Sequence, residues 1–262
     1  FKLYNRLKAT DGVNLWCVWG LRMLLLFGNG LGRSIDNEAF SLSHAIRSVC
    51  ASDLMPAESL EAMKEFLAKE PEEGIDEDDL DILHQAIFAC DFIAEAAKDR
   101  NAILTPAGLE LPGIFSRFVH NVAVTLSLNG HRLPDEFADA LAEFIQRSKP
   151  NVATLNYDQL LYRAFMDREL LRGYRGDLVD GLTDGGYDHE NLRPKFGNRF
   201  GMYLHLHGTP LVFEANDAIH KTNLGGLRFA SPAYQDQTVG RHLVLTNVRH
   251  KPLVIEQSEL LS

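Results

Sequence analysis

The sequence predicts an α/β fold, in which a helical lobe is inserted into a Rossmann-like parallel sheet. Three observations lead to this prediction. A short apolar run followed by glycines occurs near the start, residues 56–147 carry helical periodicity, and short apolar runs return after residue 150. Short buried strands that alternate with helices are typical of parallel sheets, so a long helical stretch between them indicates an insertion.

The first strand is expected at Met23–Phe27, an apolar run that leads directly into Gly28-Asn29-Gly30-Leu31-Gly32. A strand, a glycine turn and a helix start are the opening of a dinucleotide-binding βα unit. Glycines there let the backbone approach a phosphate closely. The full fingerprint needs a glycine where the chain has Arg33, so a plain tight turn explains this segment about equally well.

Four apolar stripes at helical spacing then predict four amphipathic helices. Asn129-Gly130 ends the third helix, and the acidic run Glu70–Asp81 is expected to be a solvated linker and helix start. The stripes are Leu60, Met63, Phe66 and Leu67; Leu80, Leu83, Ile87, Cys90 and Ala94; Ile114, Phe115, Phe118, Val122 and Leu126; and Phe137, Leu141, Phe144 and Ile145.

The strand pattern resumes at Asn151–Leu155, which precedes the turn Asn156-Tyr157-Asp158 and a helix starting near Leu160. A later strand, Met202–Leu206, ends at His207-Gly208, after a loop-rich stretch over Gly173–Gly201. Further strands are expected at Leu211–Phe213 and Leu243–Leu245. The predicted domains are residues 1–55 as the start of the core, 56–150 as the helical insertion and 151–262 as the remainder of the core.

Composition excludes several classes of protein. The net charge of -10 disfavours nucleic acid as a partner, because an acidic chain repels phosphate backbones. The three cysteines, Cys17, Cys50 and Cys90, form no CxxC pair, which disfavours a disulfide scaffold and a zinc knuckle. A reducing cytoplasm is therefore expected. No apolar run is long enough to cross a membrane.

Polar residues follow three of the predicted strands, and the carboxyl ends of parallel strands open on one edge of a sheet. We therefore expect the Gly28–Gly30 loop, Asn156 and His207 to converge there. Asp158 is open to a second interpretation, as a simple helix cap. His205 and His207 would share a face of one strand and could ligate a metal, but no third ligand is near, so no metal is expected.

The three motifs, in this order, resemble those of the sirtuin-like superfamily, over about residues 23–50 and 150–262. The likeness is greatest to a zinc-free bacterial branch with GNG, TLNYD and LHG motifs, here at Gly28–Gly30, Thr154–Asp158 and within Leu204–Gly208. A basic stretch like His220-Lys221, for which we expect a surface position, also occurs downstream in that branch. The resemblance further implies one more strand beyond Ser262.

The resemblance implies an NAD-binding protein without metal. Protein-deacylating members carry two CxxC pairs and a small residue in the position of Asn29, so deacylation of lysine is not expected here. The zinc-free members include NAD glycohydrolases of antiviral defence, in which equivalents of Asn156 and His207 carry the catalysis. By the same resemblance Gly28, Asn29, Gly30, Thr154 and Asp158 would contact the nucleotide.

The leading hypothesis is an NAD glycohydrolase that releases nicotinamide. Two alternatives stay open at this point: a non-catalytic module that senses a nucleotide, and a metal-dependent hydrolase using His205 and His207. Partners other than NAD or a related nucleotide would be a second copy of the chain or a component of a defence complex.

Overall fold

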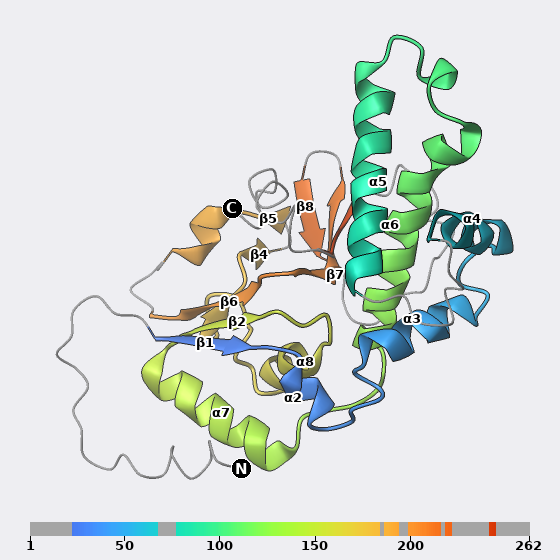
Figure 1. Ribbon diagram of the computed structural model, residues 1–262. Helices are drawn as coiled ribbons and strands as arrows, with labels where there is room; N and C mark the ends of the chain where they lie inside the picture. The colour runs from blue at the N-terminus through green and yellow to red at the C-terminus, as the bar shows by residue number, and fades with distance from the viewer. Residues whose placement is uncertain are drawn as a thin grey trace.

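The computed structural model describes residues 23–67, 77–183, 186–193, 199–215, 218–221 and 241–244 (Figure 1). Its central sheet has four strands in the order β1-β2-β6-β3, and every neighbouring pair is parallel. The strands are β1 (Leu24–Phe27), β2 (Asn151–Thr154), β6 (Gly201–His205) and β3 (Leu178–Val179). The α/β fold with a Rossmann-like parallel sheet is therefore confirmed.

Register decides which side chains of the sheet share a face. Leu25 pairs with Val152, which pairs with Tyr203, and the next row toward the carboxyl edge is Phe27, Thr154 and His205. Val152 and Tyr203 are buried in the main apolar cluster together with α7 (Asp135–Ser148) and α8 (Leu160–Asp167). These two helices therefore cover the face of the sheet that carries both rows.

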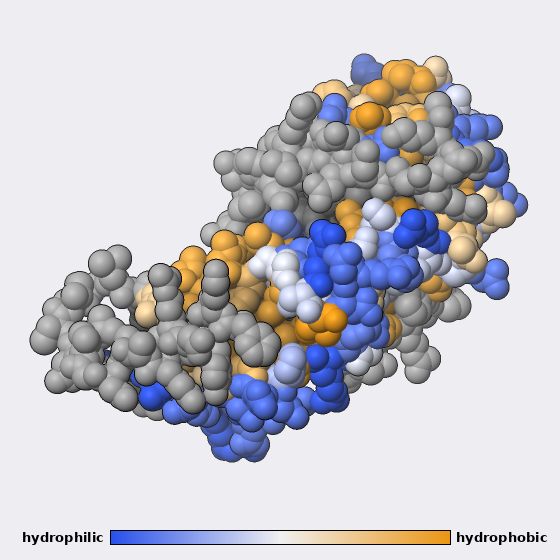
Figure 2. Space-filling view, turned by 60° about the horizontal axis from the view of Figure 1, so that its bottom comes forward, coloured by the Kyte–Doolittle hydropathy of each residue, from blue (hydrophilic) through white to orange (hydrophobic). Residues whose placement is uncertain are grey.

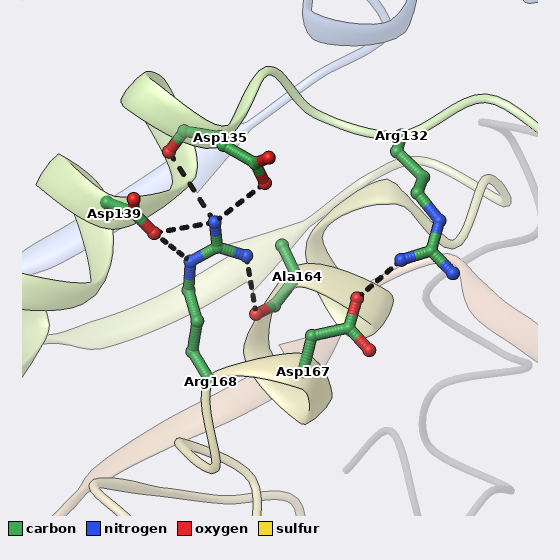
Figure 3. Close-up of polar contacts among 6 residues, drawn as sticks. All are labelled: Arg132, Asp135, Asp139, Ala164, Asp167 and Arg168. Atoms are coloured by element: carbon green, nitrogen blue, oxygen red, sulfur yellow. Dashed lines mark hydrogen bonds and ion pairs between the residues drawn. The ribbon is translucent and has the colours of Figure 1, made fainter.

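Polar contacts join α7 to the end of α8 on this face (Figure 3). The Arg168 guanidinium, which directly follows α8, donates to Asp139 at 2.7 Å and to Asp135 at 3.2 Å, both in the first turns of α7. Arg132 pairs with Asp167 at 2.8 Å. The Arg168 side chain is only 17% exposed, whereas its partners Asp135 and Asp139 are 93% and 70% exposed, so the carboxylates of these pairs remain in contact with water.

The helical lobe consists of α3 (Leu42–Cys50), α4 (Ala57–Leu67), α5 (Glu77–Ala96) and α6 (Pro106–Ser127), with the short η2 (Arg100–Ala102) before α6. Figure 1 shows α5 and α6 side by side, projecting away from the sheet. A second apolar cluster holds these helices together. The predicted helices all form, but packing associates α3 with the lobe and α7 with the sheet.

Some large apolar side chains of the lobe remain exposed, and Figure 2 shows apolar surface at its far end. The exposed apolar residues of the lobe include Ile82, Phe88, Phe92 and Ile103. None of the described helices is long and apolar enough to span a membrane.

A second sheet, with the order β8-β7-β9, is antiparallel: β7 (Gly208–Ala215), β8 (Ala218–Lys221) and β9 (Arg241–Val244). The predicted strand Leu211–Phe213 lies in β7, and the described part of Leu243–Leu245 lies in β9. Their assignment to a continuation of the parallel core was wrong. Only two residues, 206 and 207, connect β6 to β7, whereas a parallel crossover needs a dozen or more.

The segment predicted to be loop-rich, Gly173–Gly201, contains short elements that the sequence did not reveal. They are the sheet strand β3, the hairpin of β4 (Leu182–Thr183) with β5 (Gly186–Tyr187), and the 3-10 helix η3 (His189–Leu192). The predicted strand beyond Ser262 and the first 22 residues of the predicted core lie outside the described residues. The predicted domain limits stay predictions.

Candidate functional site

Three predicted site segments lie at one edge of the parallel sheet. Backbone bonds extend each ladder past the last strand residue: Leu155 N–H donates to Phe27 O at 2.9 Å, and Leu206 N–H donates to Thr154 O at 3.0 Å. The segments that follow β1, β2 and β6 are therefore adjacent. They begin with Gly28, Leu155 and Leu206, and they carry the glycine loop, Asn156 and His207.

Asn156 links the second of these segments to the first. Its side-chain Nδ2 donates to the carbonyl oxygen of Gly28 at 3.0 Å, and its backbone N–H donates to Thr154 Oγ1 at 3.1 Å. The side chain is buried, with 6% of Asn156 exposed. Thr154 is also buried, and its hydroxyl shapes the turn.

The amide oxygen of Asn156 has no hydrogen-bond partner among the described residues. The orientation of the amide follows from its neighbours, because Gly28 O and the Asp158 carboxylate are both acceptors and must face the nitrogen. A buried polar atom without a partner is costly and rare in folded proteins. The turn therefore holds buried acceptors without a partner among the described residues, Asn156 Oδ1 and Gln159 Oε1. The amide oxygen of Asn156 is suited to a hydroxyl or to water.

Asp158 stabilises the start of α8. Its Oδ1 accepts the backbone N–H of Leu160 at 3.1 Å. The N-cap of α8 is Gln159, so the interpretation of Asp158 as a simple N-cap was wrong, and Asp158 stabilises the turn just before the cap. Burial raises the pKa of the Asp158 carboxyl, while hydrogen bonds from Leu160 and Asn156 act in the opposite direction. The Asp158 carboxyl is buried and accepts a hydrogen bond from the Asn156 amide, so it helps to orient that amide.

The three glycines of the first loop have different reasons to be glycine. A Cβ added at Gly28 or Gly30 would meet nothing within 4 Å, and neither residue has a left-handed φ. At Gly32 a Cβ would come within 2.7 Å of the Phe40 ring, so close packing requires glycine there. Nothing within the described protein demands glycine at positions 28 and 30, which is consistent with close approach by a ligand.

The helix after this loop, α2 (Gly30–Arg33), has only four residues. A single turn brings few aligned peptide dipoles to its start, so it adds little to anion binding. Any phosphate contact here depends on the loop backbone and on the exposed Arg33.

His205 and His207 occupy different environments. His205 ends β6 in the row that faces α7 and α8, and its ring packs edge-on against Tyr203 at 4.9 Å. Burial, and then the charge of Lys221, lower the pKa of His205 to about 4, so this ring is neutral at physiological pH. His207 lies in the turn after β6, and its ring centroid is 6.3 Å from that of Tyr157.

The expectation that both histidines share a strand face was wrong, because β6 ends at His205 and the alternation of side chains ends with it. Within the described ranges, no group of three or more His, Cys, Asp or Glu residues is placed to hold a metal ion. Because the His205 ring packs against Tyr203 whereas His207 lies in the turn after β6, His207 is the better candidate for contact with a ligand.

Lys221 is not the surface residue that we expected. Its ammonium pairs with the Asp180 carboxylate, with side chains 22% and 13% exposed, and lies 4.6 Å from the centroid of the Tyr162 ring. Asp180 stabilises the charge of Lys221 and opposes the effect of burial on its pKa. Asp180 and Lys221 are 41 residues apart and belong to no motif, so no local signal predicts this pair.

The hydrogen bonds that Gln159 makes beside the turn after β2 were also not predicted. Gln159 Nε2 donates to Tyr157 O at 3.3 Å and to Thr209 Oγ1 at 3.2 Å, and Gln159 and Thr209 are almost completely buried. No protein-family model matches the chain, and no curated protein matches it either.

Proposed function

We propose that this protein is a sirtuin-like NAD glycohydrolase, which binds NAD at the carboxyl edge of β1, β2 and β6 and releases nicotinamide. One observation carries the proposal. The buried, unpartnered amide oxygen of Asn156 lies beside Gly28, at the edge of the sheet to which His207 also belongs. In open α/β sheets, ligands bind outside the carboxyl ends of the strands.

The chemistry needs few catalytic groups. Nicotinamide leaves a cationic glycosidic linkage as a neutral molecule, so no general acid has to protonate it, unlike the leaving group of an ordinary glycoside. The reaction requires a positioned ribose, a water molecule and a group that accepts a proton. A site without a pair of catalytic carboxylates is therefore sufficient.

Each site residue has a role in the proposal. The Asn156 amide oxygen accepts a hydrogen bond from a ribose hydroxyl or from the attacking water, which fixes the reacting geometry. The His207 ring accepts the proton that the hydroxyl or water loses. The Gly28–Gly30 backbone receives the pyrophosphate, and Asn29 lies within this loop. Thr154 and Asp158 support the turn from within the protein.

The alternative is a module that binds NAD and senses it without cleavage. Incubation of purified protein with NAD, with nicotinamide followed by chromatography, tests the first function, and calorimetry with NAD tests binding. Nicotinamide release above that of a buffer control supports the hydrolase. Binding without release favours the sensor, and neither binding nor release contradicts both.

We assign no metal-dependent hydrolysis to His205 and His207, because one ring packs against the core and the other lies in the turn. The proposal includes a cytoplasmic location and a role in antiviral defence, through a second copy of the chain or a defence component. Protection of cells against phage by the wild-type gene, and loss of it with His207→Ala, would support the defence role. Light scattering of the purified protein measures whether it forms oligomers.

A further inference from the structure

Tyr157 contacts both the helical lobe and the candidate catalytic histidine. It lies between Asn156 and Asp158 in the turn after β2, and its ring lies against His207 with the centroids 6.3 Å apart. The same side chain is half-buried against the apolar cluster of the lobe, which is built from α3, α4, α5 and α6. One aromatic ring therefore contacts two parts of the molecule that are distant in sequence.

The backbone of Tyr157 is also hydrogen-bonded to the lobe. Ser127, the last residue of α6, is 2% exposed, and its hydroxyl lies 2.6 Å from the Tyr157 carbonyl oxygen and 2.8 Å from Ala123 O. Arg163 of α8 donates to the Ser127 carbonyl at 3.0 Å. The end of α6 is thus fixed to the turn and to the helix that follows the turn.

A second set of hydrogen bonds connects the turn to β7, the strand that begins directly after His207. The Tyr157 carbonyl also accepts from Gln159 Nε2, which bonds to Thr209, two residues after His207. Gly208, between them, has a φ of 73°, a left-handed value that other residues rarely adopt. The Thr209 side chain, on the carboxyl side of His207, is therefore bonded to the turn, and the His207 ring contacts Tyr157 in the same turn.

We propose that Tyr157 is a positioning residue for His207, and that the Ser127 hydroxyl sets its place, so that the helical lobe determines the geometry of the catalytic base. The catalytic part of this inference rests on the proposed function, whereas the positioning of the ring does not. A buried hydroxyl-to-carbonyl bond contributes modestly to stability, but a small displacement of a catalytic group costs much more in turnover.

The test compares two serines that end two helices. Ser127→Ala removes the hydroxyl at the end of α6, and Ser148→Ala is the matched control, because the Ser148 hydroxyl makes the same bond to the carbonyl four residues earlier at the end of α7. Tyr157→Ala removes the ring that contacts His207. The first readout is the NMR spectrum of the full chain with labelled histidine rings, with the His207 signals assigned from His207→Ala.

We expect the His207 ring signals to shift in Ser127→Ala and Tyr157→Ala, and to stay near those of wild type in Ser148→Ala. In NAD cleavage, kcat of Ser127→Ala should fall about tenfold with little change in KM, because a misplaced base affects the reacting step more than binding. Unchanged His207 signals in Ser127→Ala would overturn the inference.

The two proposals fail in different ways. If wild type does not cleave NAD, the proposed function fails, and the NMR comparison still decides whether Ser127 and Tyr157 position His207. If wild type cleaves NAD and Ser148→Ala shifts the His207 signals as much as Ser127→Ala does, the proposed function stands and the positioning role is refuted.

Discussion

Asn156 and His207 are the residues whose loss should affect turnover more than folding. Asn156→Ala removes the amide oxygen that would contact ribose or water, and we expect cleavage per folded molecule to fall about 100-fold. The matched control is Asn191→Ala, since the Asn191 amide also donates to a glycine carbonyl, Gly181 O at 3.2 Å, and Asn191 is not one of the candidate site residues. An equal loss of cleavage in both variants would contradict the role of Asn156.

His207→Ala should reduce cleavage by about 100-fold or more, because the proton acceptor is lost. His207 lies in a turn, so its truncation should leave no large core cavity. His205→Ala is the comparison: it removes a ring packed on Tyr203 and should lower stability more than turnover per folded molecule. Full activity of His207→Ala would refute its assignment as the base.

The lowered pKa of His205 also predicts how the stability of the protein depends on pH. Its pKa of about 4 in the folded protein is below the ordinary value of 6.5, so between these values the unfolded chain binds a proton that the folded one does not. His205 therefore has no effect on stability above about pH 7, and it destabilises the fold as pH falls through 6.5 toward 4.

We expect the fall in the free energy of unfolding from pH 7 to pH 5 to be about 2 kcal/mol smaller in His205→Gln than in wild type. Urea denaturation at the two pH values measures the difference. Other groups that titrate in this range respond alike in the two proteins, so their contributions cancel when the two pH responses are compared. An identical pH response in both proteins would show that His205 is not kept neutral by burial.

At the scale of elements, substitutions at two glycines of the first loop should have different effects, one on NAD binding and the other on the stability of the protein. Gly28→Ala should leave the denaturation midpoint almost unchanged, because its Cβ would enter open space, but should weaken NAD binding if a phosphate approaches there. Gly32→Ala should instead destabilise the protein by about 1–3 kcal/mol, since its Cβ would overlap Phe40. Calorimetry and denaturation of both variants test this; equal effects on NAD binding would contradict the loop's role.

The contact between α7 and α8 should matter for stability and not for turnover. Arg168→Ala loses the bonds to Asp135 and Asp139, and we expect a loss of about 1–2 kcal/mol in the free energy of unfolding. Arg147→Ala is the control, because its pair with Glu143 is largely exposed and should be worth less than about 0.5 kcal/mol. Similar midpoints for the two variants would contradict the importance of the Arg168 contacts.

At the scale of the whole molecule, local patterns predicted the elements well. Helical stripes located α4 to α7, and apolar runs beside turns located β1, β2 and β6, because both signals come from neighbouring residues. The rule for parallel strands also brought Asn156 and Gly28 to one edge. Contacts between distant segments carry no such signal, so the pair of Asp180 with Lys221 and the bonds of Ser127 and Gln159 could not be predicted.

Strand direction was the main error, and it too depends on a feature that apolar runs do not contain. Leu211 and Val212 are apolar in either kind of sheet, and the antiparallel direction comes from the pairing of β7 with β8 and β9 in a second sheet. The short connection between β7 and β8 permits only an antiparallel pair. The helical insertion was recognised, but the residues assigned to it, 56–150, include α7, which packs on the sheet.

The central claim is that NAD binds where the loop after β1, the turn after β2 and the turn after β6 meet. A crystal structure of the protein with ADP-ribose, which contains the pyrophosphate and ribose but no bond to nicotinamide, tests it most directly. We predict the pyrophosphate on the Gly28–Gly30 backbone and a ribose hydroxyl within hydrogen-bond distance of Asn156 Oδ1, facing His207. ADP-ribose bound at another surface, with this edge of the sheet unchanged, would contradict the account.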